Sequence, residues 1–122
     1  MRFTQDSTSN VNVVRGYARG ELKINDEVFR ESVLVTAAAT QTLAGLGDVA
    51  ALTQEHAGRI LAHEPEVVLL GTGQRQVFPS PAFGARFLQA GIGFEVMDTG
   101  AACRTYNVLV TEQRRVVALL LL

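Results

Sequence analysis

The chain has 122 residues and a mass of 13.2 kDa, the size of one domain with its own hydrophobic core. Hydrophobic residues make up 48% of it and charged residues 19%, a balance that excludes an intrinsically disordered chain. The formal net charge is -1, so no overall field attracts nucleic acid or an anionic membrane surface. A single cysteine, Cys103, excludes an intrachain disulfide and a zinc site built on cysteines.

The ends of the chain bear on its location. Residues 1–10 are polar and lack the apolar segment of a secretory signal, so we predict a flexible N-terminus there and one domain over residues 11–122. The longest apolar run, VVALLLL at residues 116–122, is far shorter than the about 20 residues of a membrane-spanning helix. It is typical of a strand buried on both faces. We therefore expect a cytoplasmic protein without an integral membrane segment.

The first third of the domain has the pattern of antiparallel strands. The stretch ELKINDEVFRE at residues 21–31 forms a hairpin if its central Asn-Asp pair is a two-residue turn. That register places Leu22 opposite Phe29 and Glu21 opposite Arg30. An apolar pair and a pair of opposite charges both favour antiparallel pairing.

Strands are also predicted on either side of this hairpin. Apolar residues alternate with others over residues 11–20, and SVLVT at residues 32–36 is typical of a buried strand. Residues 37–52 are rich in alanine, glycine and threonine without clear periodicity. We predict a loop there.

Two helices follow, each with a recognisable start. The first runs from Thr53, a good N-cap, and ends by Pro65. The second begins with Pro81, which suits the first helical position, and Gly91 suits the position after its end. The apolar stripe of this second helix is predicted to consist of Phe83, Phe87 and Leu88.

A third helix is predicted over roughly residues 100–112, capped by Asp98 or Thr99. Strand 67–70, helix 81–90 and strand 94–97 make one parallel βαβ unit, and residues 116–122 add a last strand. The predicted fold class is α/β: a single domain with a mixed central β-sheet, N-terminal antiparallel strands, a parallel βαβ unit and covering helices.

The loops after the two parallel strands lie at one edge of the sheet, where open α/β sheets bind ligands. These loops are residues 71–76 and 98–107. We call their meeting point the rim and take it as the candidate ligand or partner site. Its residues are Gly71, Thr72, Gly73, Arg75, Asp98, Thr99, Arg104 and Asn107.

The rim has both a structural and a ligand-binding interpretation. The GTG at residues 71–73 lacks the third glycine of a dinucleotide fingerprint and the Gly-Lys-Ser/Thr of a P-loop, so it is a tight turn or a ligand loop. Asp98 suits a helix cap, and its carboxylate repels an anion at that helix start. Arg75 and Arg104 either clamp a carboxylate or phosphate, or pair with Asp98 and Glu95.

No catalytic residue, metal site or cofactor is predicted. Cys103 lies early in a helix beside Arg104, which lowers a thiol pKa, but its alanine neighbours favour a buried structural cysteine. His56 and His63 are seven residues apart, whereas metal ligands on a helix prefer a spacing of three or four. No catalytic triad, paired carboxylates or basic aromatic patch stands out.

Two stretches resemble a known family. VVLLGTGQRQVFPSP at residues 67–81 and GIGFEVMDTGAACRTYNVL at residues 91–109 are similar to the signature of a small α/β family of unknown function. Its members occur in bacteria and archaea and include mitochondrial assembly factor three of respiratory complex I. Tyr17, Gly20 and the hairpin also fit, so the resemblance covers approximately residues 11–120. A tryptophan associated with the segment after the hairpin is missing, since the chain has none.

The resemblance implies a single α/β domain with a mixed sheet covered by helices, and it brings no established catalytic residues. It also implies action through a protein partner. We therefore expect a non-catalytic protein-binding or assembly-factor-like domain, with a protein partner or a homo-oligomer and no nucleic acid. The alternative is a protein that binds a small molecule or anion, or an enzyme, at the rim of loops 71–76 and 98–107.

Overall fold

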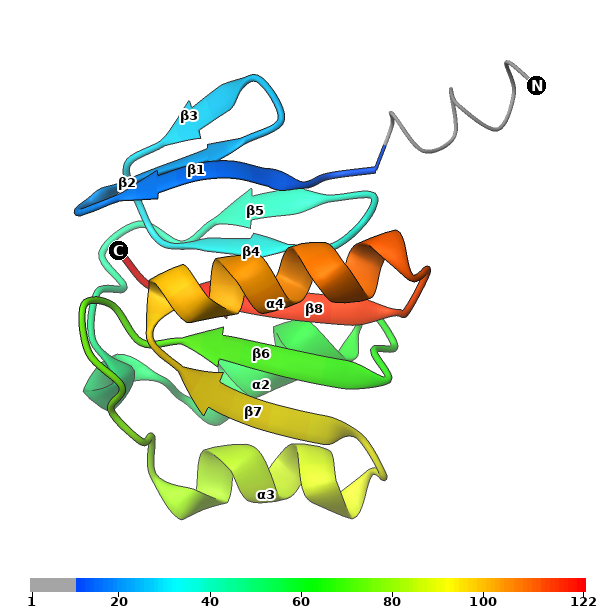
Figure 1. Ribbon diagram of the computed structural model, residues 1–122. Coiled ribbons are helices and arrows are strands. Elements are labelled where there is room, and N and C mark those ends of the chain that lie inside the picture. Colours follow the sequence, from blue (N-terminus) through cyan, green and yellow to red (C-terminus); the bar gives the residue numbers. More distant parts are fainter. Residues whose placement is uncertain (1–10) are drawn as a thin grey trace.

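The computed structural model describes residues 11–122, so the prediction for residues 1–10 lies outside it (Figure 1). Over the described residues the chain forms two β-sheets with helices packed against the larger one. The small sheet is antiparallel and consists of β1 (Val14–Ala18), β2 (Glu21–Ile24) and β3 (Glu27–Phe29). The large sheet is mixed, with the order β5-β4-β8-β6-β7: β4 (Val33–Val35), β5 (Thr40–Thr42), β6 (Val67–Gly71), β7 (Gly93–Met97) and β8 (Val116–Leu120).

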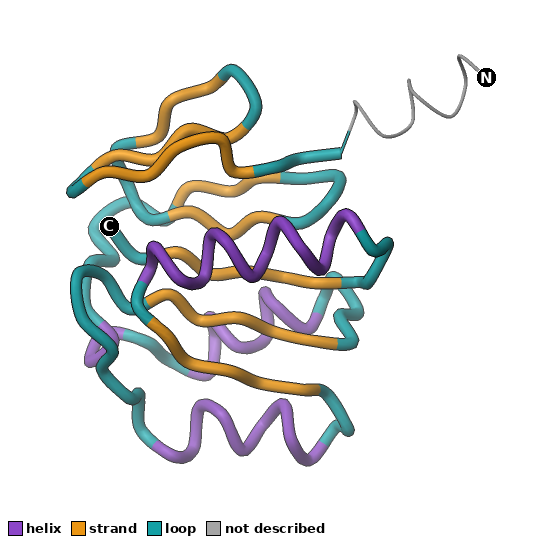
Figure 2. Tube along the Cα trace, in the orientation of Figure 1, coloured by secondary structure: helices purple, strands orange, loops and turns teal. Residues whose placement is uncertain are grey.

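The helices are a short 3-10 helix, η1 (Val49–Ala51), and three α-helices: α2 (Gln54–Leu61), α3 (Pro81–Gln89) and α4 (Thr99–Thr111). Figure 2 shows α4 lying across one face of the large sheet, with α2 and α3 on the other. The α/β class and the mixed sheet are as predicted. The difference is that the N-terminal strands form their own sheet, and only β4 and β5 extend the central one on its antiparallel side.

The hairpin prediction is confirmed in its register. Leu22 pairs with Phe29 across β2 and β3, and Arg30 Nη2 lies 3.3 Å from Glu21 Oε1. The turn is possible because Asn25 adopts φ 51°, a left-handed conformation that asparagine tolerates better than most residues.

The predicted loop over residues 37–52 contains β5 and η1. Periodicity gave no sign of β5 because all three of its residues are exposed, so it lacks an apolar face. Among residues 11–122 it is an edge strand that pairs with β4 alone, with Val33 opposite Thr42. Asp48 caps η1 by accepting a hydrogen bond from the N–H of Ala50 (2.9 Å).

The last strand in the sequence lies in the middle of the large sheet. β8 is antiparallel to β4 and parallel to β6, and all five of its residues are buried. Beyond it, the N–H of Leu121 donates to the carbonyl of Gly71 (2.9 Å). The continuous apolar pattern of residues 116–122 is therefore explained by neighbours on both edges and layers on both faces.

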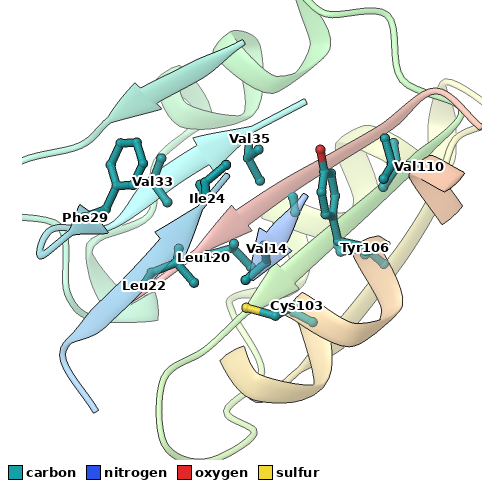
Figure 3. Close-up of a cluster of buried hydrophobic side chains, with 14 of the residues drawn as sticks. Val14, Leu22, Ile24, Phe29, Val33, Val35, Cys103, Tyr106, Val110 and Leu120 are labelled. Atoms are coloured by element: carbon teal, nitrogen blue, oxygen red, sulfur yellow. The ribbon is translucent and has the colours of Figure 1, made fainter. Parts of the chain in front are cut away.

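The large sheet separates two hydrophobic clusters. The first lies between α4, the large sheet and the small sheet (Figure 3), and its largest fully buried side chain is Tyr106. The second lies under α2 and α3, where Phe83 and Phe87 pack against each other and against Phe94.

The stripe predicted for α3 is right at Phe83 and Phe87 but wrong at Leu88, which is 63% exposed. The reason is Gly84. A Cβ on Gly84 would lie 2.8 Å from the ring of Phe94, so glycine lets that ring press against the helix. The helix therefore buries the face that carries residues 83, 84 and 87, and Leu88 turns to solvent.

Asn12 joins the small sheet to the connection between β4 and β5. Its backbone N–H donates to Ala37 (2.9 Å), and its side-chain amide donates to Thr36 (3.0 Å) and Ala39 (3.2 Å). Its side-chain oxygen accepts from Asn25 Nδ2 (3.1 Å). Asn12 thus links three backbone carbonyls of the β4–β5 connection to the side chain of Asn25 in the hairpin turn of the small sheet.

Candidate functional site

The loops after β6 and β7 meet at one edge of the sheet, as their parallel pairing requires (Figure 1). The N–H of Thr72 donates to the carbonyl of Met97 (2.9 Å), and the N–H of Thr99 donates to the carbonyl of Gly73 (2.9 Å). The geometry therefore brings together five of the predicted rim residues: Gly71, Thr72, Gly73, Asp98 and Thr99.

Most polar groups at this rim bond to one another. The Thr99 hydroxyl accepts from the N–H of Gly73 (2.7 Å) and donates to the carbonyl of Leu121 (2.7 Å). The Thr72 hydroxyl donates to the carbonyl of Arg75 (2.5 Å). Asp98 caps α4, since its Oδ1 accepts from the N–H of Ala101 (2.8 Å). The rim has the features of a closed turn that holds β6, α4 and the end of β8 together.

Two glycines make that turn possible. A Cβ on Gly71 would lie 3.0 Å from the Cβ of Ala102 and from the Cα of Thr99, so α4 can approach β6 only because residue 71 has no side chain. Gly73 adopts φ 96°, a conformation that L-residues with a side chain rarely adopt. The GTG stretch thus has a complete structural explanation as a tight turn.

The two predicted rim arginines do not converge. Both are exposed, and within residues 11–122 neither forms an ion pair with Asp98 or Glu95, the structural one of the two alternatives that the sequence left open. Arg104 lines a hollow of about 260 Å³ between β1 and α4, together with Arg15 and Tyr17. Arg75 does not line it.

Asn107 lies away from the rim, which corrects its predicted place. Its Nδ2 donates to the carbonyl of Val14 (2.7 Å), and its Oδ1 accepts from the N–H of Val14 (2.8 Å). The neighbouring Tyr106 donates its hydroxyl to the carbonyl of Asn12 (2.7 Å). Both side chains of α4 therefore hold the small sheet. The signal available in the sequence was the helical spacing of residues 103, 106 and 110, which marks the buried face beside Asn107.

Cys103 is a buried structural residue. It is 4% exposed and lies in the cluster shown in Figure 3. Desolvation by burial raises the pKa of its thiol to about 12, and the nearby charge of Arg104 offsets only part of that rise. The expected lowering by Arg104 and the helix start is therefore outweighed by burial.

We expect the native protein to resist thiol alkylation at pH 8, because both the thiolate fraction and the exposure of Cys103 are low. The measurement is the rate of iodoacetamide labelling by mass spectrometry, with the urea-unfolded protein as the reference. The unfolded chain should label at the rate of a free cysteine. Equal rates in the native and unfolded proteins would contradict the buried assignment.

The histidines do not form a shared site. His56 completes a capping box of α2, in which its Nδ1 accepts from the N–H of Thr53 (2.9 Å). His63 is exposed beyond the other end of α2. Across residues 11–122 no group of three histidine, cysteine, aspartate or glutamate side chains is placed to hold a metal ion.

Residues 14–121 match the family model described as "Protein of unknown function (DUF498/DUF598)". The chain belongs to this family. A "13 kDa major membrane protein" of Francisella tularensis subsp. holarctica is 32% identical over 103 residues, which are 82% of this chain and 82% of that protein. The "NADH dehydrogenase [ubiquinone] 1 alpha subcomplex assembly factor 3" of Xenopus tropicalis is 37% identical over 62 residues, 51% of this chain and 34% of that protein.

Solved structures of similar proteins show the same fold. A solution structure of a Bordetella pertussis protein, described as a Mth938-like domain, has a TM-score of 0.77 and 31% identity, covering 93% of this chain and 87% of that one. The family resemblance expected from residues 67–81 and 91–109 is thus confirmed. Within residues 11–122, no helix has the length and apolar character needed to cross a bilayer.

The loop between β6 and α3, which belongs to the first of the two family stretches, presents apolar side chains to solvent. Phe78 is 70% exposed and Val77 is 42% exposed. The loop is held from two sides: the N–H of Val77 donates to the Thr72 hydroxyl (3.1 Å), and Gln76 Nε2 donates to the carbonyl of Val96 (2.8 Å). Sequence reasoning missed Phe78 as a site residue, although prolines 79 and 81 mark a stiff loop there.

Proposed function

We propose that the protein is a non-catalytic protein-binding domain that acts in the manner of an assembly factor. The observation that carries the proposal is the exposed Phe78 on a loop fixed by hydrogen bonds. The naming of one relative as an assembly factor supports it.

An exposed aromatic side chain on a fixed loop can insert into an apolar pocket of a partner protein. Burying a phenylalanine removes a large apolar area from water, and interfaces concentrate their binding energy in a few such anchors. Because the loop is already held by Thr72 and Gln76, little conformational entropy is lost when it binds. Val77 beside it extends the apolar surface.

Protein binding is better supported than anion binding at the rim. The N–H groups of Thr72, Gly73 and Ala101 bond within the chain, and the Asp98 carboxylate lies at the helix start where an anion would bind. An anion would have to displace these bonds. Burial of the apolar loop against a protein partner leaves these hydrogen bonds intact.

Native affinity capture from cells that carry this gene should recover a stoichiometric partner with the wild-type chain. Truncating a central anchor costs about 2 kcal/mol, so Phe78→Ala should weaken the complex about 30-fold by calorimetry with the purified partner. Val108→Ala, which truncates a 57% exposed valine on α4, is the matched control and should bind like the wild type.

Two results would contradict the proposal: recovery of no stoichiometric partner, or equal binding by Phe78→Ala and the wild type. Light scattering identifies a second copy as the partner if the wild type is dimeric and Phe78→Ala is monomeric.

A further inference from the structure

A cleft of about 460 Å³ lies where α4 ends and β8 begins. Figure 1 shows that this end of α4 is opposite the loops after β6 and β7. Its apolar wall is formed by Ala37 and Ala38 from the β4–β5 connection, Val110 of α4 and Val116 of β8. Its volume lies within the range of about 300–1,000 Å³ that is typical of small-molecule sites.

Basic side chains form the polar edge of this cleft. Arg114, Arg115 and His63 line it, and no acidic residue among the described ones does. Arg114 lies before β8, at the turn that leaves α4, and His63 lies beyond the end of α2. The edge is thus assembled from two parts of the chain that are distant in sequence.

Both arginines are held by one atom each. Arg114 Nε lies 3.0 Å from Glu66 Oε2, and Arg115 Nε donates to the carbonyl of Glu64 (3.1 Å). Within residues 11–122 the terminal Nη groups of Arg115 have no hydrogen-bond partner. A guanidinium fixed through Nε keeps its other donors for an anion, with less side-chain entropy to lose.

Glu66 neutralises one of these charges and fixes the pair. Its Oε1 accepts from the backbone N–H of Arg115 (2.9 Å), and that bond, followed by the hydrogen bond from Arg114, holds the pKa of Glu66 below its usual value. The carboxylate therefore remains ionised at neutral pH. The second guanidinium leaves the edge of the cleft positive.

We propose that this cleft binds a small amphiphile with an acidic head and a short aliphatic tail. The tail lies along the alanine and valine wall, and the carboxylate or phosphate head accepts hydrogen bonds from the Nη groups of Arg115, beside the Arg114–Glu66 ion pair. An apolar wall alone would take many ligands. The two oriented guanidinium groups at its edge select an anion.

The test is an NMR titration of the full chain with octanoate below its micelle concentration. Saturable shifts are expected at Ala37, Ala38, Val110 and Val116. Each methylene added from butanoate to octanoate should tighten binding about fourfold, the affinity equivalent of burying one methylene. Octanol should bind about tenfold more weakly than octanoate, because it lacks the charge-assisted hydrogen bonds. Octyl phosphate tests a phosphate head in place of the carboxylate of octanoate. Binding of either compound at these residues supports the proposal.

Variants connect the binding to the cleft. Arg115→Gln should weaken octanoate binding about tenfold, and Ala38→Asp, which places a negative charge on the wall, should weaken it further. Arg75→Gln, which changes an exposed arginine at the rim, is the matched control and should bind like the wild type. Unchanged urea unfolding midpoints show that each variant is folded.

The proposal is overturned if the wild type shows no saturable shift with octanoate or octyl phosphate. It is also overturned if the shifts fall at the rim, or if Arg75→Gln weakens binding as much as Arg115→Gln does.

Discussion

Replacing Thr99 by valine is expected to lower the free energy of unfolding by about 2–4 kcal/mol, although the two side chains have nearly the same shape. Thr99 is fully buried, and its hydroxyl bonds both the N–H of Gly73 and the carbonyl of Leu121. Valine leaves both backbone groups without a partner. A buried polar group that loses its partner costs about 1–3 kcal/mol; the carbonyl of Leu121 is buried, and the N–H of Gly73 is partly so.

Thr99→Ser separates the hydroxyl from the methyl group. Serine keeps both hydrogen bonds and loses one methyl, so the expected loss is only about 1 kcal/mol. The measurement is urea unfolding of the two variants and the wild type, with equal dependence on urea as the check for two-state behaviour. Equal destabilisation by valine and serine would show that packing, and not the hydroxyl, holds the rim.

Asn107→Ala is expected to lower the free energy of unfolding by about 2–3 kcal/mol, because it removes two hydrogen bonds to a partly buried strand. The lost bonds are those to the N–H and the carbonyl of Val14 in β1. They are the side-chain link between α4 and the small sheet, along with the hydroxyl of Tyr106. The loss should therefore be concentrated in β1, β2 and β3.

Hydrogen exchange resolves where that loss falls. In Asn107→Ala the amides of Leu22 and Ile24 should exchange faster, while those of Leu69 and Ala118 keep most of their protection. Val108→Ala removes a neighbouring exposed side chain and should change neither group. A uniform loss of protection through both sheets would show that the small sheet does not open separately.

Local rules were enough to predict much of this fold. The Asn-Asp turn sets the register of Leu22 against Phe29, and Asp98 caps α4 through its own carboxylate. Both depend on residues a few positions apart, where the chemistry of one side chain decides the backbone. The parallel βαβ rule likewise placed the loops after β6 and β7 at one edge.

The errors concern side chains whose orientation is set by distant residues. Leu88 is exposed because Gly84 accepts the ring of Phe94, ten residues later. Asn107 faces β1 because the small sheet covers α4 on that side, 93 residues earlier in the chain. Helical periodicity identifies a buried face, but it does not say which neighbour meets each position on it.

At the rim, too, sequence spacing did not reveal the contacts with distant residues that decide whether a polar group is free to bind a ligand. Spacing brought Gly73 and Thr99 together, but the bond that closes the turn goes to Leu121, at the far end of β8. Only the position of β8 shows that these polar groups satisfy one another. The exposed Phe78 escaped prediction for a related reason: a phenylalanine in a sequence is expected in the core until its loop is placed.

The central position of β8 has a consequence for how the protein folds. The pairs β4–β5 and β6–β7 come earlier in the chain, yet they join only through β8, which each flanks on one side. Until residues 116–120 insert, both pairs carry an open edge and the two halves of the sheet have no register with each other. The sheet therefore closes late, through contacts between distant parts of the chain, which slows folding and leaves apolar strand edges open to aggregation in the meantime.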